Sequence, residues 1–501
     1  MKINIVNYAL FLLVPVLLIS CKTEHDKKIQ QKIEEPYNVL FIAIDDLRPE
    51  LNSYGAGHIK STNIDRLSSE GIRFSNAHVQ QSICMASRAS VMSGIRPERN
   101  GIYTGEPISD VLPDVLTMNK FFKQSGYNIA SVGKIYHFGQ DTKNQFGSDY
   151  IKPKATWEGF GYVTQEAIKQ RTLNTNTGRG PAYESANVHD TIYEDGINTL
   201  NAIRKLREFK NDDKPFFMAV GLTKPHLPFV APQKYWDMYP KDSIGFSELN
   251  ERPRNTSSHT MRSSGELGNY YNMPRFYDDI ADSTALTLRR GYYACVSYAD
   301  AQVGKLLDEM DNLGLRENTI VVLWGDHGYK LGDYGSWCKW SNMNLDTNIP
   351  LIFSVPNGKK GEVYSHPVEA LDLYPTLAEL CNLKRPEHLE GKSLMSVLTD
   401  PQAEPKSKTY AYTIWPHQRW NYRNTVMGYS VTDDRFNYVE WVKLDNGEVL
   451  ERELYDHDKD PYETINVVED ETYTQIVADL ADKVKSRKVA TDHDHNFRNV
   501  K

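Results

Sequence analysis

VLFIAIDD, residues 39–46, places an unbroken apolar run directly before two aspartates. A run without polar alternation is typical of a strand that is buried on both faces, as in a parallel sheet covered by helices. Short, largely apolar runs recur at 128–132, 216–222 and 320–324. The sequence therefore predicts an α/β fold with a large, mostly parallel sheet.

Each of these runs is followed closely by charged or imidazole side chains. They are Asp45-Asp46, Lys134, Lys224 with His226, and Asp326-His327. Open α/β sheets carry their sites at the carboxyl ends of the strands. We therefore expect these side chains to gather at one edge of the sheet.

Other segments complete the predicted architecture. Helices are expected over 63–70, 114–125 and 195–209. Residues 240–275 are rich in Ser, Asn, Arg and Pro and have no clear period, so they predict a long loop over the same edge of the sheet. Beyond a boundary at 396–408, MGYSVTD and FNYVEWV predict strands and a helix follows over about 472–487, which together indicate a smaller α+β domain.

The N-terminus has the features of an export signal. Lys2 precedes an apolar stretch over 9–19 that is too short to span a bilayer as a stable helix. Its end, LISC, resembles a bacterial lipobox, in which Cys21 is lipidated; the alternative is a plain signal peptide with an incidental cysteine. The expected location is the bacterial cell envelope, with the exported protein held by a lipid anchor. The predicted organisation is a signal peptide over 1–21, a polar tether over 22–36, a catalytic domain over 37–400, a smaller domain over 408–490 and a tail over 491–501.

The two paired motifs indicate a cation site. Two carboxylates about 4 Å apart repel by roughly 1 kcal/mol in water and by about 4 kcal/mol at an effective dielectric near 20. A divalent ion removes this repulsion, and oxygen ligands with some imidazole suit calcium or magnesium. The alternatives are that one aspartate of Asp45-Asp46 caps a turn while the other faces solvent, and that Asp326 caps a helix beside a hydrogen-bonded His327.

SICMASRASVMSG, residues 82–94, raises a separate question. If a helix begins near Cys84, then Arg88 lies one turn further along the same face, and the helix N-terminus adds partial positive charge. An arginine-activated thiolate or a buried structural thiol are the ordinary interpretations. Neither explains a neighbouring site for a hard cation, because thiolates prefer soft metals.

CMASR followed by ASVMSGIRP resembles the signature of the type I sulfatases, C-x-P/A-S-R, whose cysteine is converted after translation into formylglycine. The resemblance continues through GKIYHFG (133–139), TKPHLPF (223–229), LWGDHGYKLGDYGSWCKWSN (323–342) and ELYDHDKDPYETIN (453–466). Within that family the sequence is most similar to iduronate-2-sulfatases and bacterial polysaccharide sulfatases. The resemblance implies an alkaline-phosphatase-like sandwich, in which a large mixed, mostly parallel sheet lies between helices, with a smaller C-terminal α+β domain.

The resemblance also implies a role for each motif residue. One calcium ion is expected to be held by Asp45, Asp46, Asp326, His327 and the formylglycine made from Cys84. Arg88 would steady the hydrated aldehyde, while Lys134 and Lys339 would bind the sulfate oxygens. His226 would protonate the departing sugar oxygen, and His137 would take the remaining hydroxyl proton. Ala86 stands where many of these enzymes have proline, which leaves the identity of the formylglycine-generating maturation enzyme open.

The predicted function is hydrolysis of sulfate esters in a sulfated polysaccharide or oligosaccharide. A 2-O-sulfated uronic acid or a neighbouring sulfated sugar is expected, as in glycosaminoglycans or algal ulvan. The formal net charge of −8 argues against a general nucleic-acid binder. Two alternatives remain: a phosphomonoesterase or phosphodiesterase of the same superfamily, and a noncatalytic glycan-binding surface lipoprotein. Candidate specificity residues, for which ordinary packing is the alternative, are Trp337, His417, Trp420 and Arg423.

Overall fold

The computed structural model describes residues 36–152, 161–261, 265–275, 279–400, 409–417 and 426–492. The signal segment with Cys21, the tether up to residue 35, Trp420, Arg423 and the tail beyond residue 492 lie outside these ranges. Among the helices within them, none combines the length and the apolar character needed to cross a bilayer.

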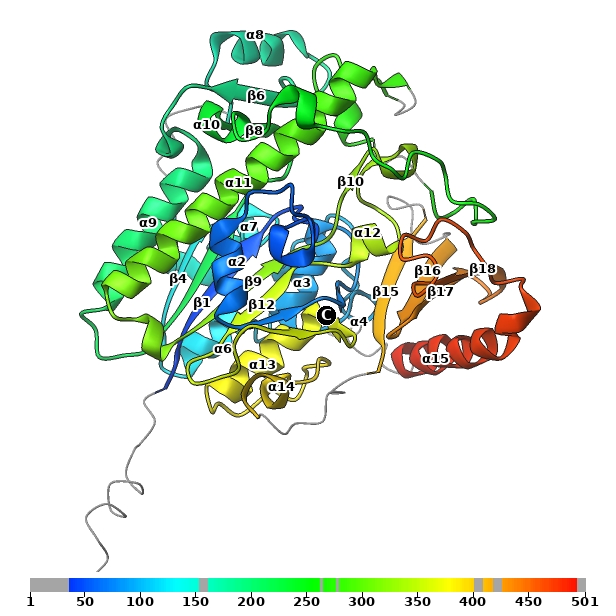
Figure 1. The fold of residues 1–501 in the computed structure, drawn as a ribbon. Coiled ribbons are helices and arrows are strands. Elements are labelled where there is room, and N and C mark those ends of the chain that lie inside the picture. The colour runs from blue at the N-terminus through cyan, green and yellow to red at the C-terminus, as the bar shows by residue number, and fades with distance from the viewer. Residues whose placement is uncertain are drawn as a thin grey trace, which may run out of the picture. The chain divides into compact units, whose positions relative to one another are not determined.

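An eight-stranded sheet forms the centre of the fold, in the order β13-β2-β12-β9-β1-β7-β4-β5 (Figure 1). Only β12 runs antiparallel to its neighbours, so the prediction of a mixed, mostly parallel sheet is confirmed. The strands are β1 (Asn38–Ile44), β2 (Ile72–Phe74), β4 (Asn128–Gly133), β5 (Tyr150–Ile151), β7 (Phe216–Leu222), β9 (Thr319–Gly325), β12 (Leu351–Ser354) and β13 (Glu362–Tyr364).

The four apolar runs of the sequence are β1, β4, β7 and β9, which are adjacent in the order β9-β1-β7-β4. Their pairings are all parallel, with Ile44 beside both Leu222 and Gly325. Because adjacent parallel strands end at the same edge, the residues that follow them are brought together.

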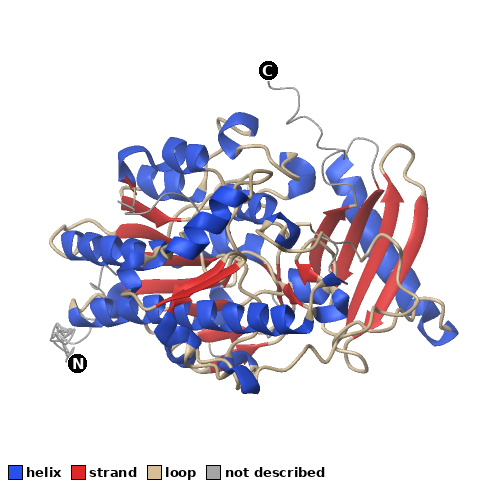
Figure 2. Cartoon of the chain, turned by 90° about the horizontal axis from the view of Figure 1, so that it is seen from above, coloured by secondary structure: helices blue, strands red, loops and turns tan. Residues whose placement is uncertain are grey.

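Helices cover both faces of the sheet, as Figure 2 shows. Leu40, Ile42 and Ile44 of β1 face a core shared with α2 (Thr62–Ser69), α9 (Glu194–Phe209) and α11 (Asp282–Asn312). The alternate residues of β1 face a second core shared with α3 (Cys84–Ser93), α6 (Met118–Gln124) and α13 (Leu373–Leu380). Burial on both faces explains why the strand is apolar throughout.

The helices predicted from the sequence agree in part with those of the structure. The segments predicted over 63–70 and 195–209 are α2 and α9, whereas the one predicted over 114–125 is shortened to α6 because Pro113 and the turn after it precede the helix. The longest helix, α11, was not predicted. It is buried on several sides, so its sequence lacks the single apolar stripe of an amphipathic helix.

The remaining helices and strands of the main sheet domain are short. They are β3 (Ala77–His78) with β14 (Val368–Glu369), β6 (Tyr183–Ala186) with β8 (Phe229–Pro232), β10 (Lys330–Leu331) with β11 (Trp337–Cys338), α4 (Pro97–Asn100), α5 (Ile108–Val111), α7 (Gly139–Phe146), α8 (Gln165–Leu173), α10 (Gln233–Trp236), α12 (Asn344–Thr347) and α14 (Met395–Thr399).

A second, antiparallel sheet lies near the C-terminus. Its strands pair in chain order, and the two predicted ones are β16 and β17; the full set is β15 (Ala411–Pro416), β16 (Val426–Thr432), β17 (Phe436–Lys443) and β18 (Val449–Asp456). The helix α15 (Thr474–Asp492) packs Leu480 and Val484 against this sheet. Trp415 and Trp441 pack instead against Ile83, Met85 and Ala86, so the second sheet supports the segment that carries Cys84.

The carboxyl ends of β4 and β7 approach each other closely at a pair of glycines. Gly133 and Gly221 are register partners. A Cβ added at Gly221 would lie 2.0 Å from the carbonyl oxygen of Lys134, and one at Gly133 would lie 2.0 Å from the carbonyl oxygen of Gly221. Since backbone atoms cannot yield as a flexible side chain does, both positions require glycine.

We therefore expect Gly221→Ala to lower the free energy of unfolding by about 2 kcal/mol or more, because the added methyl group must push β4 and Lys134 away. Urea unfolding measures the effect. Gly245→Ala is the matched control, since a Cβ there has no heavy atom within 4 Å and its cost should stay within about 0.5 kcal/mol. Equal effects of the two substitutions would contradict this account.

Candidate active site

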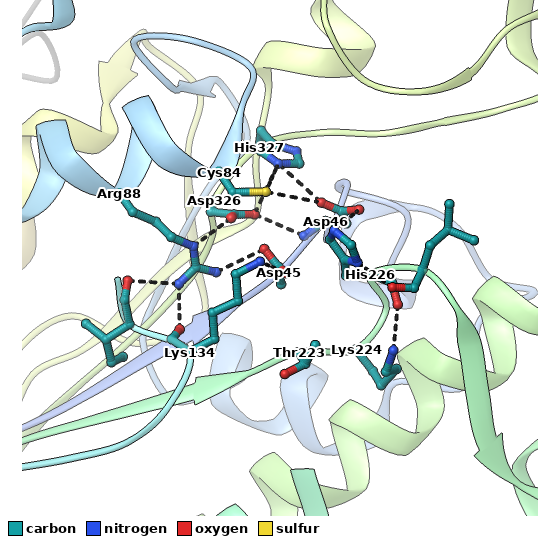
Figure 3. A network of polar contacts seen from close by, with 12 residues as sticks. Asp45, Asp46, Cys84, Arg88, Lys134, Thr223, Lys224, His226, Asp326 and His327 are labelled. Atoms are coloured by element: carbon teal, nitrogen blue, oxygen red, sulfur yellow. Dashed lines mark hydrogen bonds and ion pairs between the residues drawn. The ribbon is translucent and has the colours of Figure 1, made fainter. Parts of the chain in front are cut away.

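The polar residues that follow β1, β4, β7 and β9 converge, as the sequence predicted (Figure 3). Asp45, Asp46, Asp326 and His327 are fully buried, with no measurable exposure. Ligand atoms of Asp45, Asp46, Cys84 and His226 lie within 4.8 Å of one another, and so do those of Cys84, Asp326 and His327. The two groups share Cys84, which places residue 84 at the centre of the site.

The turn after β1 holds Asp46 in an unusual conformation. Its φ angle is 60°, in the left-handed region, which typically costs 1–3 kcal/mol for a residue other than glycine. The backbone N–H of Asp46 donates to Asp326 Oδ1 at 2.9 Å, and its carbonyl accepts from the hydroxyl of Tyr292 at 2.8 Å. Tyr292 belongs to α11, so this helix holds the backbone of Asp46 in place.

Arg88 connects the ends of three strands. The helix α3 begins at Cys84, as predicted, and Arg88 lies one turn along it. Its guanidinium donates to Asp326 Oδ2 at 2.8 Å and to Asp45 Oδ1 at 3.2 Å, and also to the carbonyl oxygens of Lys134 and Ile135. These partners account for the guanidinium hydrogen bonds within the described chain. Arg88 therefore connects the buried carboxylates of Asp45 and Asp326, in addition to lying on the same helical face as Cys84, as expected.

The sulfur of Cys84 faces hard ligands. Its Sγ atom lies 3.2 Å from Nε2 of His327 and 3.9 Å from Oδ1 of Asp46. Burial raises the pKa of the Cys84 thiol well above its ordinary value, and the lysines nearby only partly oppose this. A thiol in this position stays protonated at neutral pH and is a poor nucleophile.

Two lysines each pair with one of the adjacent aspartates that follow β1. Lys134 Nζ forms a short ion pair with Asp45, while Lys339 Nζ lies 2.9 Å from both carboxylate oxygens of Asp46. Burial alone would lower the pKa of Lys339, but Asp46 and Glu266 raise it well above its ordinary value. Both lysines are therefore held as cations.

The backbone around Lys339 is strained. Cys338 and Trp340 have φ angles of 69° and 94°, so both neighbours of Lys339 lie in the left-handed region. Strain of this kind persists only where the surrounding packing imposes it, and it clusters at functional sites. Trp340 packs in the apolar cluster that contains Trp415 and Ala86, which supplies such packing.

His226 stands on a loop that other residues fix. Asp195 accepts hydrogen bonds from the backbone N–H groups of Thr223 and Lys224, each at 2.8 Å. The ammonium of Lys224 donates to the carbonyl oxygens of His226 and Pro228. The imidazole Nδ1 of His226 lies 2.5 Å from the carbonyl oxygen of Leu227, so its Nε2 faces the site.

His137 is mostly buried close to these groups. Burial lowers its pKa to about 3, and the positive charge of Lys134 acts in the same direction. The imidazole is consequently neutral at ordinary pH. Its buried Nδ1 has no hydrogen-bond partner among the described residues, so this nitrogen remains available as a proton acceptor.

Glu266 is a member of the site that the sequence analysis did not identify. Its Oε1 lies 3.1 Å from Nε2 of His226, and its Oε2 lies 2.9 Å from Nζ of Lys339. It comes from the predicted long loop over 240–275, which does reach this edge of the sheet. No local pattern distinguishes Glu266 from other acidic residues of the loop, so only its spatial neighbours reveal it.

The donor set fits a hard divalent cation. Three carboxylates and two imidazoles offer oxygen and nitrogen ligands within a small buried volume. Burial raises the pKa of Asp326, and the negative charge of Asp45 acts in the same direction. A cation would relieve this penalty. The thiol of Cys84 is the one ligand of the wrong type for such an ion.

A cavity of about 260 Å³ opens beside this cluster, and its lining includes Lys134, His226, Tyr193, Glu194 and Lys224. Trp337 and His417, the two candidate specificity residues within the described ranges, are not part of that lining. Trp337 is 4% exposed and packs in the main core, which favours a packing role. His417 packs its ring against His259, with ring centroids 4.5 Å apart.

Comparison with known proteins agrees with the geometry. Residues 37–383 match the family described as Sulfatase, and residues 332–490 match the one described as N-sulphoglucosamine sulphohydrolase, C-terminal. Human iduronate 2-sulfatase is 31% identical, over 86% of this chain and 91% of the relative. An ulvan-active sulfatase from Formosa agariphila is 29% identical, over 83% of this chain and 75% of the relative.

The fold also has solved counterparts. The structure of a 2-O GAG sulfatase superposes with a TM-score of 0.69 at 23% identity, covering 93% of this chain and 94% of that one. This likeness supports the alkaline-phosphatase-like fold, with a large mixed sheet between helices and a smaller C-terminal sheet domain. The family match over residues 37–383 identifies the chain as an enzyme that hydrolyses sulfate esters, and it belongs to the sulfatase family.

Proposed function

We propose that this sulfatase acts on a sulfated carbohydrate, with formylglycine at position 84 and one calcium ion. The observation that carries the proposal is the position of Cys84 as the first residue of α3, with its Sγ atom 3.2 Å from His327 and within reach of Asp46. A buried, protonated thiol is a poor nucleophile and an unsuitable ligand for a hard cation. A hydrated aldehyde at this position supplies an oxygen for both purposes.

The expected calcium ligands are Asp45, Asp46, Asp326, His327 and the oxygen at position 84. Bound there, a calcium ion would supply positive charge that lowers the pKa of a hydroxyl nucleophile and polarises the sulfate group. Arg88 would orient two of these ligands, since its guanidinium already donates hydrogen bonds to Asp45 and Asp326.

The remaining residues are assigned to the substrate. Lys134 and Lys339, held as cations by buried carboxylates, would bind the sulfate oxygens in a site with little water. His226 would donate a proton from Nε2 to the departing sugar oxygen, because its Nδ1 is engaged by the carbonyl of Leu227. His137, neutral at ordinary pH, would accept the proton of the remaining hydroxyl at residue 84.

The names of the relatives support a sulfated glycan as substrate. They include an iduronate 2-sulfatase and an ulvan-active sulfatase, and a 2-O GAG sulfatase shares the fold. We infer a 2-O-sulfated uronic acid or a neighbouring sulfated sugar as the target. The lipobox-like LISC at the N-terminus supports an exported protein anchored to the cell envelope through Cys21, and CMASR supports recognition by a formylglycine-generating enzyme.

Cys84→Ala should lower aryl sulfate hydrolysis by about a thousandfold or more, because the alanine methyl group cannot form the aldehyde. Protein from the native host should also yield a Cys84 peptide whose mass matches an aldehyde in place of the thiol. Cys295→Ala, at another buried cysteine, should retain activity. An intact thiol in fully active enzyme, or faster cleavage of the matched aryl phosphate, would overturn the proposal.

Removing divalent ions with EDTA should abolish activity, and calcium should restore it together with a higher midpoint of thermal unfolding. The stabilisation should reach about 2.7 kcal/mol at a calcium concentration one hundred times the Kd. Asp326→Asn should lose this calcium response. Asp300→Asn removes a buried carboxylate that accepts from the backbone of Asn63 and Ile64, and should keep the response. An unchanged midpoint after calcium addition would argue against the ion.

His137 should make stability depend on pH. Its pKa falls from 6.5 to about 3 on folding, so the unfolded chain binds this proton more readily and stability decreases as the pH drops from about 6.5 towards 3. His137→Gln should reduce the slope of unfolding free energy against pH in this window by up to about 1.4 kcal/mol per pH unit. Urea unfolding across that range measures the slope. The exposed His189→Gln is the control, and an identical slope in both variants would refute a buried neutral His137.

A further inference from the structure

Glu266 is placed against the part of the site that meets the substrate. Its carboxylate bridges Nε2 of His226 at 3.1 Å and Nζ of Lys339 at 2.9 Å, and its side chain is only 12% exposed. Burial alone would raise the pKa of Glu266, but Lys339 and His226 hold it well below its ordinary value, so the group is ionised. A fixed negative charge therefore lies between the Lys339 ammonium and the His226 imidazole.

The other buried carboxylates of the cluster have a different placement. Asp45 pairs with Arg88 and Lys134, and Asp326 pairs with Arg88. Asp46 pairs with Lys339, and all three aspartates follow the ends of β1 and β9 where the cation is expected. Glu266 stands outside that ligand set, so its charge is not used to hold the ion.

We propose that Glu266 determines the charge selectivity of the site, favouring a singly charged sulfate monoester over a doubly charged phosphate monoester. The inference rests on the proposed function, in which Lys339 contacts the sulfate and His226 the ester oxygen. Glu266 partly neutralises the positive charge of Lys339 and lies against the His226 imidazole. The second negative charge of a phosphate group would meet repulsion from the Glu266 carboxylate that a sulfate monoester largely avoids.

The size of the effect follows from Coulomb's law. Two unit charges roughly 5–7 Å apart at an effective dielectric near 20 interact strongly enough to change an affinity ratio by about tenfold or more. The expected change is in the ratio of the affinities for the doubly charged and the singly charged anion. A change that merely loosens the site would weaken both anions together and leave their ratio unaltered.

Inhibition by a matched pair of nonhydrolysable anions tests the proposal. Benzenesulfonate carries one charge, and phenylphosphonate carries two at an alkaline pH. Glu266→Gln should shift the ratio of their inhibition constants towards phenylphosphonate by about tenfold or more. Glu266→Asp keeps the charge and should retain most of the wild-type preference. Glu266→Ala provides a second charge-removing variant if the glutamine variant folds poorly.

Glu50→Gln is the matched control, because Glu50 is another buried carboxylate that pairs with an arginine, Arg48, and a histidine, His58, outside the proposed site. The ratio of the two inhibition constants in Glu50→Gln should equal that of the wild type. A ratio that is unchanged in Glu266→Gln, whether the two anions bind more weakly or more tightly together, would overturn the inference.

The same pair of anions can be measured by thermal shift on Cys84→Ala protein, with and without the additional Glu266→Gln change. This readout needs no turnover, so it separates the two proposals. Wild-type protein that fails to cleave aryl sulfates would refute the proposed function. A ratio insensitive to residue 266 in protein that does cleave them would refute only the role of Glu266.

Discussion

Repulsion between buried carboxylates is the constraint on which the site depends. Asp45, Asp46 and Asp326 meet where two parallel strands end, at a position with no exposure to water. Their charges are compensated by Arg88, Lys134 and Lys339, each of which is itself buried or nearly so. Paired charges of this kind are costly to break, because loss of one partner leaves the other buried and unpaired. The cluster is therefore a single electrostatic unit.

The fold holds that unit in a conformation that its local sequence does not favour. Asp46, Cys338 and Trp340 all have left-handed backbone angles. The hydroxyl of Tyr292 fixes the first, and packing from the second sheet surrounds the residues near Trp340. Contacts from elements that are far apart in the chain thus stabilise the strained backbone at these three residues. Such rigid placement suits a reaction in which charge must be stabilised without rearrangement of the site.

The site also has two sides with different electrostatic demands. The aspartates and His327 form the side suited to a divalent ion, whereas Lys134, Lys339 and His226 face the side suited to an anion. Glu266 limits the positive charge on this second side. Strong positive potential would attract any anion, so selection between related anions requires some negative charge close to the binding position.

Much of the site was predictable because its residues follow local patterns. The short, largely apolar runs of β1, β4, β7 and β9 identified the strands. The residues after them converge because parallel neighbours end at one edge. Cys84 and Arg88 were predicted on one helical face, and α3 begins at Cys84. Continuous burial on both faces of a strand leaves this signature in the sequence itself.

Other features were decided by contacts between distant segments. Glu266 is one acidic residue among several in an irregular loop, and its role depends on Lys339 and His226 lying beside it. Tyr292 lies on α11, a helix buried on several sides that therefore lacks a clear amphipathic pattern. Strands and helix starts depend on neighbouring residues, so the sequence alone determined them. Charge pairing across the site depends on distances in space, and only the tertiary structure set those distances.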